Sequence, residues 1–257
     1  MKIGCGVHSD SLAIHHDMLF ALPVIEIENF LFPGFADRAQ MELPRVKAAL
    51  DGYNGAVVVS APYIDLNPGS PERLTIEAAR LRFEQTYAFA QALGTSEIIF
   101  LSTFIPIIYL SAYEDDWVAR SITFWRSFME IVDPGVMISL GNVFEFRPDY
   151  LVQIAGEVNR PNFRLTFDLG HFLVYSRIEL AGWLAKIAPY CSTVYVHSNN
   201  GQMDTHDEPY IGSLRPDQIA LVAKVLAPDA RFIIKAMNKE TTGQSVDWVL
   251  KAARSQR

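Results

Sequence analysis

Residues 164–197 read RLTFDLGHFLVYSRIELAGWLAKIAPYCSTVYVH, and this segment predicts a strand, a helix and a second strand. Its two ends, 164–167 and 193–197, are short runs rich in the β-branched and aromatic residues that favour strands. Between them, an apolar stripe with the 3.6-residue spacing of a helix is formed by Leu180, Leu184, Ile187 and Ala188. Helical connections of this kind join parallel strands.

The same pattern repeats along the whole chain. Strand-like runs also occupy residues 2–7, 24–28, 56–60, 97–101, 136–140 and 231–235, and helical stripes lie within 118–132, 151–158 and 219–226. Most runs are continuously apolar, which is typical of strands covered on both faces. Eight strand–helix units in about 250 residues match a (β/α)8 barrel. We therefore predict an α/β fold, a (β/α)8 TIM barrel, with residues 1–257 as one domain. A doubly wound open sheet is the alternative if the eighth strand does not form.

The composition is that of an ordinary globular protein. The chain has 257 residues, 50% of them hydrophobic, and its 29 acidic and 22 basic residues give a formal net charge of -7. The acidic balance disfavours nucleic acid as a partner. The two cysteines, Cys5 and Cys191, are far apart and indicate no disulfide framework. Because we find neither a signal peptide nor an apolar segment long enough to span a bilayer, we expect no membrane association and a cytoplasmic location.

Function in such a barrel lies at the C-terminal ends of the strands and in the loops that follow them. The positions expected there are Glu26, Glu28, Ser60, 101–103, Gly141, Asn142, 168–171, 197–199 and Lys235. Three nearby segments, 167–171, 197–201 and 204–206, combine Asp, His and Asn residues, and Asp and His are common ligands of divalent metals. Asp204 and His206 are two residues apart, so an extended backbone would point both side chains the same way.

Each of these residues also has a purely structural interpretation. A single aspartate at a strand end, such as Asp168, is commonly a helix N-cap or turn residue. A single histidine in a loop is usually exposed to solvent. The occurrence of these residues together, at two neighbouring strand ends, favours a functional site.

Several segments resemble the xylose-isomerase-like barrel superfamily, which includes sugar phosphate isomerases and epimerases and class II apurinic endonucleases. The similarity runs over almost the whole chain and is clearest in VVVSAPYIDL (57–66), LTFDLGHFLVYS (165–176) and YVHSNNGQMDTH (195–206). In epimerases of this superfamily a metal is held by Glu, Asp, His and Glu from strands five to eight, and the two glutamates also move the proton. The matching positions here are Gly141, Asp168, His197 and Lys235, so both glutamates are replaced.

The resemblance leaves one metal set intact. It implies that His171, Asp204 and His206 can hold a single divalent ion, Zn or Mn, and the competing interpretation is that no metal binds. Three protein ligands and a water form the usual arrangement of a catalytic zinc site. In the endonucleases, further zinc ions are bound by histidines where this chain has Ser60 and Ser102 or Thr103.

The exchange of two carboxylates for one ammonium makes the predicted site much more positive. We therefore expect Lys235 to take the place of the lost ion and to pair with Asp168, since an unpaired buried charge is costly. The alternative is a salt bridge that only closes the barrel. As catalytic residues the sequence indicates Asp168, His197 and Lys235. A Schiff base at Lys235 is disfavoured, because an adjacent carboxylate raises the pKa of the amine.

Three loops expected at the same end are unusually apolar. They cover residues 30–35, 104–109 and 143–146. Apolar loops either line a ligand pocket or pack against another chain, so a homo-oligomer formed through them is one expectation. Arg147 is the only nearby cation, which disfavours a highly charged substrate.

These observations lead to three functional hypotheses. The first is a sugar phosphate isomerase/epimerase-like enzyme that acts on a small polyol or keto compound, with Asp168 or His197 as the acid or base. The alternative is a catalytically degenerate relative, a binding scaffold in which Lys235 replaces the metal. An apurinic endonuclease is the least favoured, because of the acidic balance and the replaced zinc histidines.

Overall fold

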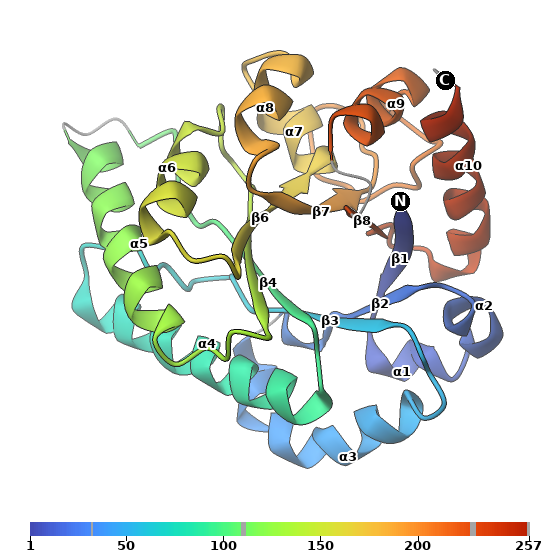
Figure 1. Cartoon of the computed structure of the whole chain (residues 1–257), viewed down its shortest axis with the longest axis horizontal. Helices are drawn as coiled ribbons and strands as arrows, with labels where there is room; N and C mark the ends of the chain where they lie inside the picture. Colours follow the sequence, from blue (N-terminus) through green and yellow to red (C-terminus); the bar gives the residue numbers. More distant parts are fainter. Residues whose placement is uncertain (32, 109–111, 227–229, 256–257) are drawn as a thin grey trace.

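The computed structural model describes residues 1–31, 33–108, 112–226 and 230–255, and it forms a closed barrel of parallel strands (Figure 1). Each strand pairs with the next, and β1 also pairs with β8. The strands are β1 (Lys2–Val7), β2 (Val24–Ile27), β3 (Ala56–Ser60), β4 (Glu97–Leu101), β5 (Met137–Gly141), β6 (Phe163–Asp168), β7 (Cys191–Val196) and β8 (Arg231–Ile234).

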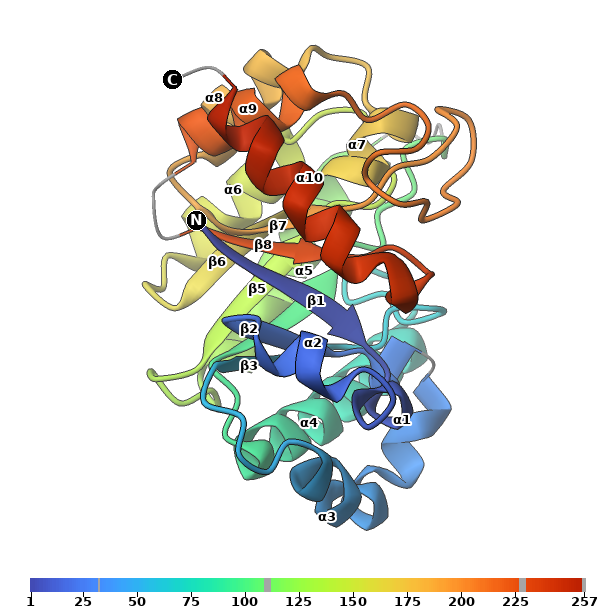
Figure 2. The ribbon, with the colours of Figure 1, turned by 90° about the vertical axis from the view of Figure 1, so that its right-hand side faces the viewer.

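Helices surround the barrel on its outer side (Figures 1 and 2). They are α1 (Ser9–Leu12), α2 (His16–Phe20), α3 (Ala39–Ala49), α4 (Arg73–Leu93), α5 (Tyr113–Met129), α6 (Asp149–Val158), α7 (Leu169–Tyr175), α8 (Leu180–Ile187), α9 (Pro216–Val225) and α10 (Thr242–Arg254). Short 3-10 turns lie at Asn29–Leu31, Pro33–Asp37 and Lys239–Thr241. Among the described residues, no helix is both long and apolar enough to cross a bilayer.

The longest helix, α4, shows how sequence and packing agree. Its buried residues Ala79, Phe83, Tyr87 and Ala90 recur every three or four positions, so one face meets the barrel. The helix ends at Gly94, whose φ of +77° is a left-handed conformation that glycine adopts without a steric penalty.

The barrel interior has its own packing. Val24, Val58, Ile99, Tyr195 and Ile233 form a cluster separate from the main core between strands and helices. Their strands are buried on both faces, which explains the continuously apolar runs in the sequence. Polar residues occupy the two ends of this interior, above and below the apolar layer.

The predicted fold is confirmed, and the doubly wound open sheet is wrong. All eight strands lie within two residues of their predicted bounds. The pairing of β1 with β8 closes the sheet and joins the first and last strands, which supports the proposal that residues 1–257 form one domain.

Candidate metal centre and active site

The site begins where β6 passes directly into α7. Asp168 is the last residue of β6 and the N-cap of α7, and its Oδ1 accepts the backbone N–H of His171 at 2.9 Å. The structural role considered for an aspartate at this position is therefore present. The cap also fixes the first turn of α7, which carries His171 into the site.

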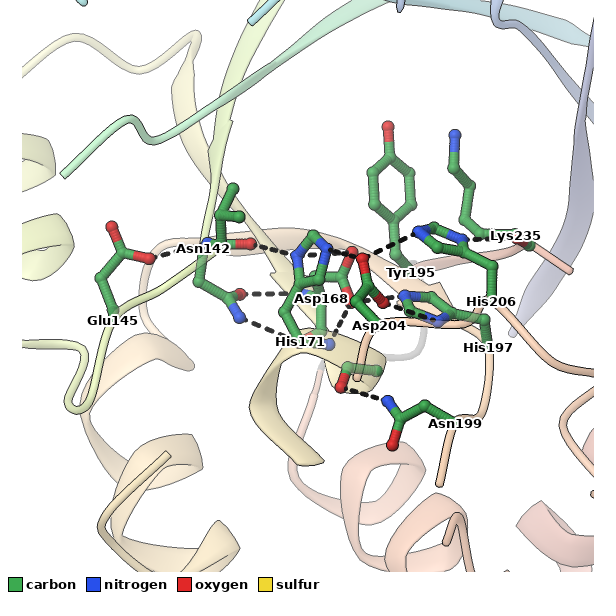
Figure 3. Close-up of polar contacts among 12 residues, drawn as sticks. Asn142, Glu145, Asp168, His171, Tyr195, His197, Asn199, Asp204, His206 and Lys235 are labelled. Carbon is green, nitrogen blue, oxygen red and sulfur yellow. Dashed lines mark hydrogen bonds and ion pairs between the residues drawn. The ribbon is translucent and has the colours of Figure 1, made fainter. Parts of the chain in front are cut away.

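Two histidines converge on one carboxylate oxygen (Figure 3). The Nε2 atom of His171 lies 3.0 Å from Asp204 Oδ2, and the Nε2 atom of His206 lies 3.2 Å from the same oxygen. His206 has a φ of +51°, a left-handed conformation that is rare for a residue other than glycine. The loop after β7 thus bends sharply to bring Asp204 and His206 against His171.

The other ring nitrogen of each histidine is held by a main-chain carbonyl. Nδ1 of His171 lies 2.8 Å from the carbonyl oxygen of Asn142, and Nδ1 of His206 lies 2.8 Å from that of Lys235. A carbonyl can only accept, so each Nδ1 donates its proton. The Nε2 atoms are thereby directed at the carboxylate, which is the orientation that metal-ligating histidines need.

His197 lies close to this group but is arranged differently. Its side chain is fully buried, and Nε2 lies 3.0 Å from Asp168 Oδ1. The ring stacks on that of His206 with 3.8 Å between centroids and 5° between planes. This stacking needs Gly170, since a Cβ there would lie 2.0 Å from the His197 ring.

Stacking limits which residues can share an ion. The four side chains His171, His197, Asp204 and His206 have possible ligand atoms within 4.8 Å of one another. An imidazole binds a metal in its ring plane at about 2.0–2.1 Å. Nε2 of His206 faces Asp204, whereas His197, stacked parallel to it, directs Nε2 at Asp168. The geometry therefore favours His171, Asp204 and His206 as the ligands.

The carboxylates and histidines of this cluster shift each other's pKa values toward the charged forms of Asp168 and His171. Burial alone would raise the pKa of Asp168, but the charges of His171 and His197 outweigh it and lower the pKa to about 2. Burial alone would lower the pKa of His171, but Asp168 and Asp204 raise it to about 9. In the protein without a metal, His171 is thus a cation between two carboxylates.

Asp204 shows the clearest sign of a missing partner. Its Oδ1 is buried and forms no hydrogen bond with the described residues, with His197 Nδ1 at 3.7 Å, while Oδ2 faces both Nε2 atoms. A buried carboxylate oxygen without a hydrogen bond costs free energy that a bound cation would recover. Two imidazoles and a carboxylate are a donor set that suits zinc or manganese, so the residues fit one divalent ion.

The predicted pairing of Lys235 with Asp168 is wrong. Lys235 Nζ instead lies 2.8 Å from Glu26 Oε2 and also contacts the carboxylate of Glu28. The reason lies on β1, between β8 and β2 in the sheet. A Cβ at Gly6 would lie 2.2 Å from Glu28 Oε1, so the missing side chain leaves room for this contact.

Lys235 lies inside the C-terminal end of the barrel, which we call the barrel mouth. Its side chain is 11% exposed and runs beside Tyr195, with Nζ 4.5 Å from the ring centroid (Figure 3). Burial opposes its charge, but Glu26 and Glu28 raise the pKa of the amine above its usual value. Because these carboxylates neutralise it, the ammonium does not stand in for an ion beside Asp168.

Position 141, the other place where the resemblance led us to expect a glutamate, also has a close neighbour. A Cβ at Gly141 would lie 2.8 Å from Leu101 Cδ2. The side chain of Leu101 thus occupies space beside β5 that a longer residue at 141 would need.

Three contributors to the site were given no role by the sequence. Asn142, Glu26 and Glu145 are all buried, and each accepts hydrogen bonds from residues of the strand ends or loops. Glu26 had a usable signal, because a single acidic residue in a run of buried apolar ones needs a partner. Glu145, flanked by Phe144 and Phe146, carried the same signal.

The apolar loops divide between core and surface. Phe30, Phe35 and Phe104 are buried, whereas Ile107 is 78% exposed and Phe144 is partly exposed. Two of the loop residues, Phe32 and Tyr109, lie outside the described residues.

The chain is similar to known proteins in sequence and in structure. The model of a family described as xylose isomerase-like TIM barrel matches residues 24–219. An uncharacterised protein of Methanocaldococcus jannaschii is 29% identical over 168 residues, which is 61% of this chain. The match spans 56% of that relative, a little more than half of its length.

Two solved structures share the fold over the full chain. A D-tagatose 3-epimerase-like protein has a TM-score of 0.78 and 21% identity, and covers 100% of this chain and 99% of its own. A Thermus thermophilus protein soaked with zinc chloride has a TM-score of 0.75 and 19% identity, with 100% of both chains covered. Because the family model matches well over half of the residues, the chain belongs to the family of xylose isomerase-like TIM barrels.

Proposed function

We propose that this chain is a metal-dependent enzyme of the isomerase or epimerase type that acts on a small polyol or keto compound. The observation that carries the proposal is the buried Oδ1 of Asp204, which has no hydrogen bond among the described residues and only His197 Nδ1 at 3.7 Å, beside two histidine Nε2 atoms that face the same carboxylate. Family membership supports the reaction class, and the similarity to a D-tagatose 3-epimerase-like protein supports a sugar-like substrate.

His171, Asp204 and His206 would hold the ion, and the donor set favours Zn or Mn. A divalent ion there supplies Lewis acidity toward a substrate oxygen. Among the proposed catalytic residues, Lys235 has the most exposed side chain, at 11%, and its ammonium would donate a hydrogen bond to a second substrate oxygen. The neighbouring carboxylate of Glu28, whose side chain is 20% exposed, would accept the proton that leaves the substrate carbon. The carboxylates of Glu26 and Glu28 keep it charged and fixed.

Burial narrows the roles proposed for Asp168 and His197. Their side chains are 2% and 0% exposed, so neither reaches a substrate in this arrangement. We assign them to positioning: Asp168 caps α7 and holds both His171 and His197, and His197 supports the ring of His206.

The charges around the site favour an uncharged substrate. Arg147, which directly follows the apolar loop 143–146, already pairs with Glu114 at 2.7 Å and lies over the ring of Tyr150, and the guanidinium of Arg177 is stacked on Phe146. A phosphate would need a free cation of this kind. We therefore favour an unphosphorylated polyol or keto sugar.

A homo-oligomer formed through the apolar loops remains a proposal. Ile107 and Met237, on the loops after β4 and β8, are 78% and 77% exposed. Light scattering of the wild type and of Ile107→Ser would test it. A monomeric wild type, or an oligomer whose mass Ile107→Ser leaves unchanged, would contradict it.

Zinc titration followed by a deuterium-exchange assay tests the main proposal. Zinc-loaded protein is incubated with D-tagatose or D-fructose in D2O, and NMR detects deuterium at the carbons beside the carbonyl. We expect one zinc per chain and deuterium incorporation that Asp204→Ala abolishes. Failure to take up zinc or manganese would overturn the metal site, whereas uptake without exchange would overturn only these substrates.

A further inference from the structure

Asn142 forms a reciprocal pair of hydrogen bonds with the backbone of Asp168. The side-chain Nδ2 donates to the carbonyl oxygen of Asp168 at 2.9 Å, and Oδ1 accepts the N–H of the same residue at 2.8 Å. Both residues are buried. The amide thus satisfies both main-chain groups at the residue that caps α7.

This contact extends the β5–β6 pairing by side chain. The last main-chain register pair between these strands is Gly141 with Thr166, and Asn142 follows immediately. A carboxamide has the same donor and acceptor as a peptide group, so it can continue the ladder where the backbones separate. Aspartate, which has the same size, would offer only acceptors and would face the Asp168 carbonyl with an oxygen.

The same residue holds a metal ligand. The main-chain carbonyl of Asn142 accepts the Nδ1 proton of His171 at 2.8 Å, and Asp168 accepts the N–H of His171. The side chain of Asn142 therefore fixes two parts of the structure at once: its own carbonyl and the N-cap of α7. Both determine where Nε2 of His171 points.

We propose that Asn142 is a positioning residue of the metal centre, which sets the orientation of His171 by locking the ends of β5 and β6 together. This inference rests on the proposed function only in taking His171, Asp204 and His206 as the metal ligands. Groups that orient a ligating histidine typically change metal affinity by about 10- to 100-fold when they are removed.

The test compares Asn142→Ala with a matched control, Asn29→Ala. Asn29 is also a buried asparagine with a reciprocal clamp, since its Oδ1 accepts the Ser9 N–H at 2.9 Å and its Nδ2 donates to Ser9 Oγ at 2.7 Å. No contact found between described residues joins Asn29 to the four clustered side chains. The two variants lose the same kind of hydrogen bonds, but only one of them is next to the site.

Zinc affinity and the visible absorption of the cobalt-substituted protein are measured for both variants and for Asn142→Asp. We expect Asn142→Ala and Asn142→Asp to weaken zinc binding about 10- to 100-fold and to change the cobalt spectrum. Asn29→Ala should keep the wild-type zinc affinity and cobalt spectrum, even if its unfolding midpoint falls as far as that of Asn142→Ala.

The outcomes separate this inference from the proposed function. Wild-type zinc affinity and cobalt spectrum in Asn142→Ala would overturn the positioning role and leave the metal site standing. Equal losses in Asn29→Ala would also overturn it, because the effect would then be general destabilisation. A wild-type chain that binds neither metal would overturn both proposals.

Discussion

Two buried glutamates lie inside the barrel at its opposite ends, and each pairs with a cation from the strand β8 or the residue after it. At the N-terminal end, Glu97 pairs with Arg231, and at the C-terminal end, Glu26 pairs with Lys235. Hydroxyl groups complete both environments. Glu97 accepts from Ser139 and Thr193, and Glu26 accepts from Ser60 and Tyr195.

The chemistry of the two pairs is nearly the same, and their surroundings differ. The carbonyl of Lys235 accepts the Nδ1 proton of His206, so the upper pair, Glu26 with Lys235, is joined to the metal centre through one residue. The lower pair, Glu97 with Arg231, lies at the N-terminal end of the barrel, the end that serves stability. The comparison teaches that position along the strand, more than the type of ion pair, decides whether a buried charge supports folding alone or folding and function.

The largest effect is expected where the lower pair is broken. Arg231→Met leaves the carboxylate of Glu97 buried without a cation, which should lower the free energy of unfolding by about 3–5 kcal/mol. Urea denaturation measures this, and zinc titration should show unchanged affinity. Zinc affinity is compared under conditions where the variant and the wild type are folded to the same extent. A lower affinity in the variant would show that the N-terminal pair also supports the metal centre.

Breaking the upper pair should affect stability and function together. Lys235→Met leaves Glu26 and Glu28 without their ammonium, and we expect a loss of about 3 kcal/mol and at least a tenfold fall in deuterium exchange. Adding Glu26→Gln should restore much of the stability without restoring exchange. Recovery of exchange in the double variant would assign Lys235 a structural role only.

The pH dependence of the metal-free protein should report on the centre itself. The pKa of His171 is about 9 in the folded chain, above its ordinary value of 6.5. Its stabilising contribution is therefore fully present below pH 6.5 and is lost as the pH rises through 9. With EDTA present, the free energy of unfolding should fall by about 2–3 kcal/mol between pH 6 and pH 9.5. The same fall in His171→Asn would contradict this assignment.

The smallest effect concerns Glu145, a buried carboxyl for which the described residues provide no ion pair. One oxygen accepts the Val143 N–H at 2.7 Å, and the side chain of Ser102 lies near the carboxyl. Burial raises the pKa of Glu145 above its usual 4.5, so its ionisation destabilises the fold as the pH rises above that value. Glu145→Gln should stabilise the protein by about 1 kcal/mol at pH 8 and by less at pH 4, as measured by urea denaturation. An equal gain at both pH values would argue against a buried charge.

The fold could be predicted from the sequence because each strand is covered on both faces. Segments such as 56–60 and 97–101 consist largely of apolar residues, and their spacing along the chain left room for one helix after each. The sequence also allowed us to predict that His171, Asp204 and His206 lie close together, because the strand ends of a closed parallel barrel meet at one rim.

The partner of Lys235 could not be predicted in the same way. Charge balance indicates that a buried lysine needs a carboxylate, but it does not say which one. The choice of Glu26 and Glu28 over Asp168 depends on the empty space at Gly6, a packing detail between strands that are distant in sequence. The stacking of His197 on His206 depends in the same way on Gly170.

The missing side chain at Gly6 constrains how descendants of this chain can change. A glutamate at position 235 would place a third carboxylate beside those of Glu26 and Glu28, with Lys239 near Glu28 at 3.5 Å, and like charges in one buried site oppose ionisation. A larger residue at position 6 would displace Glu28. A carboxylate at position 235, or a larger residue at position 6, should therefore destabilise this end of the barrel, so positions 6, 28 and 235 are expected to change together.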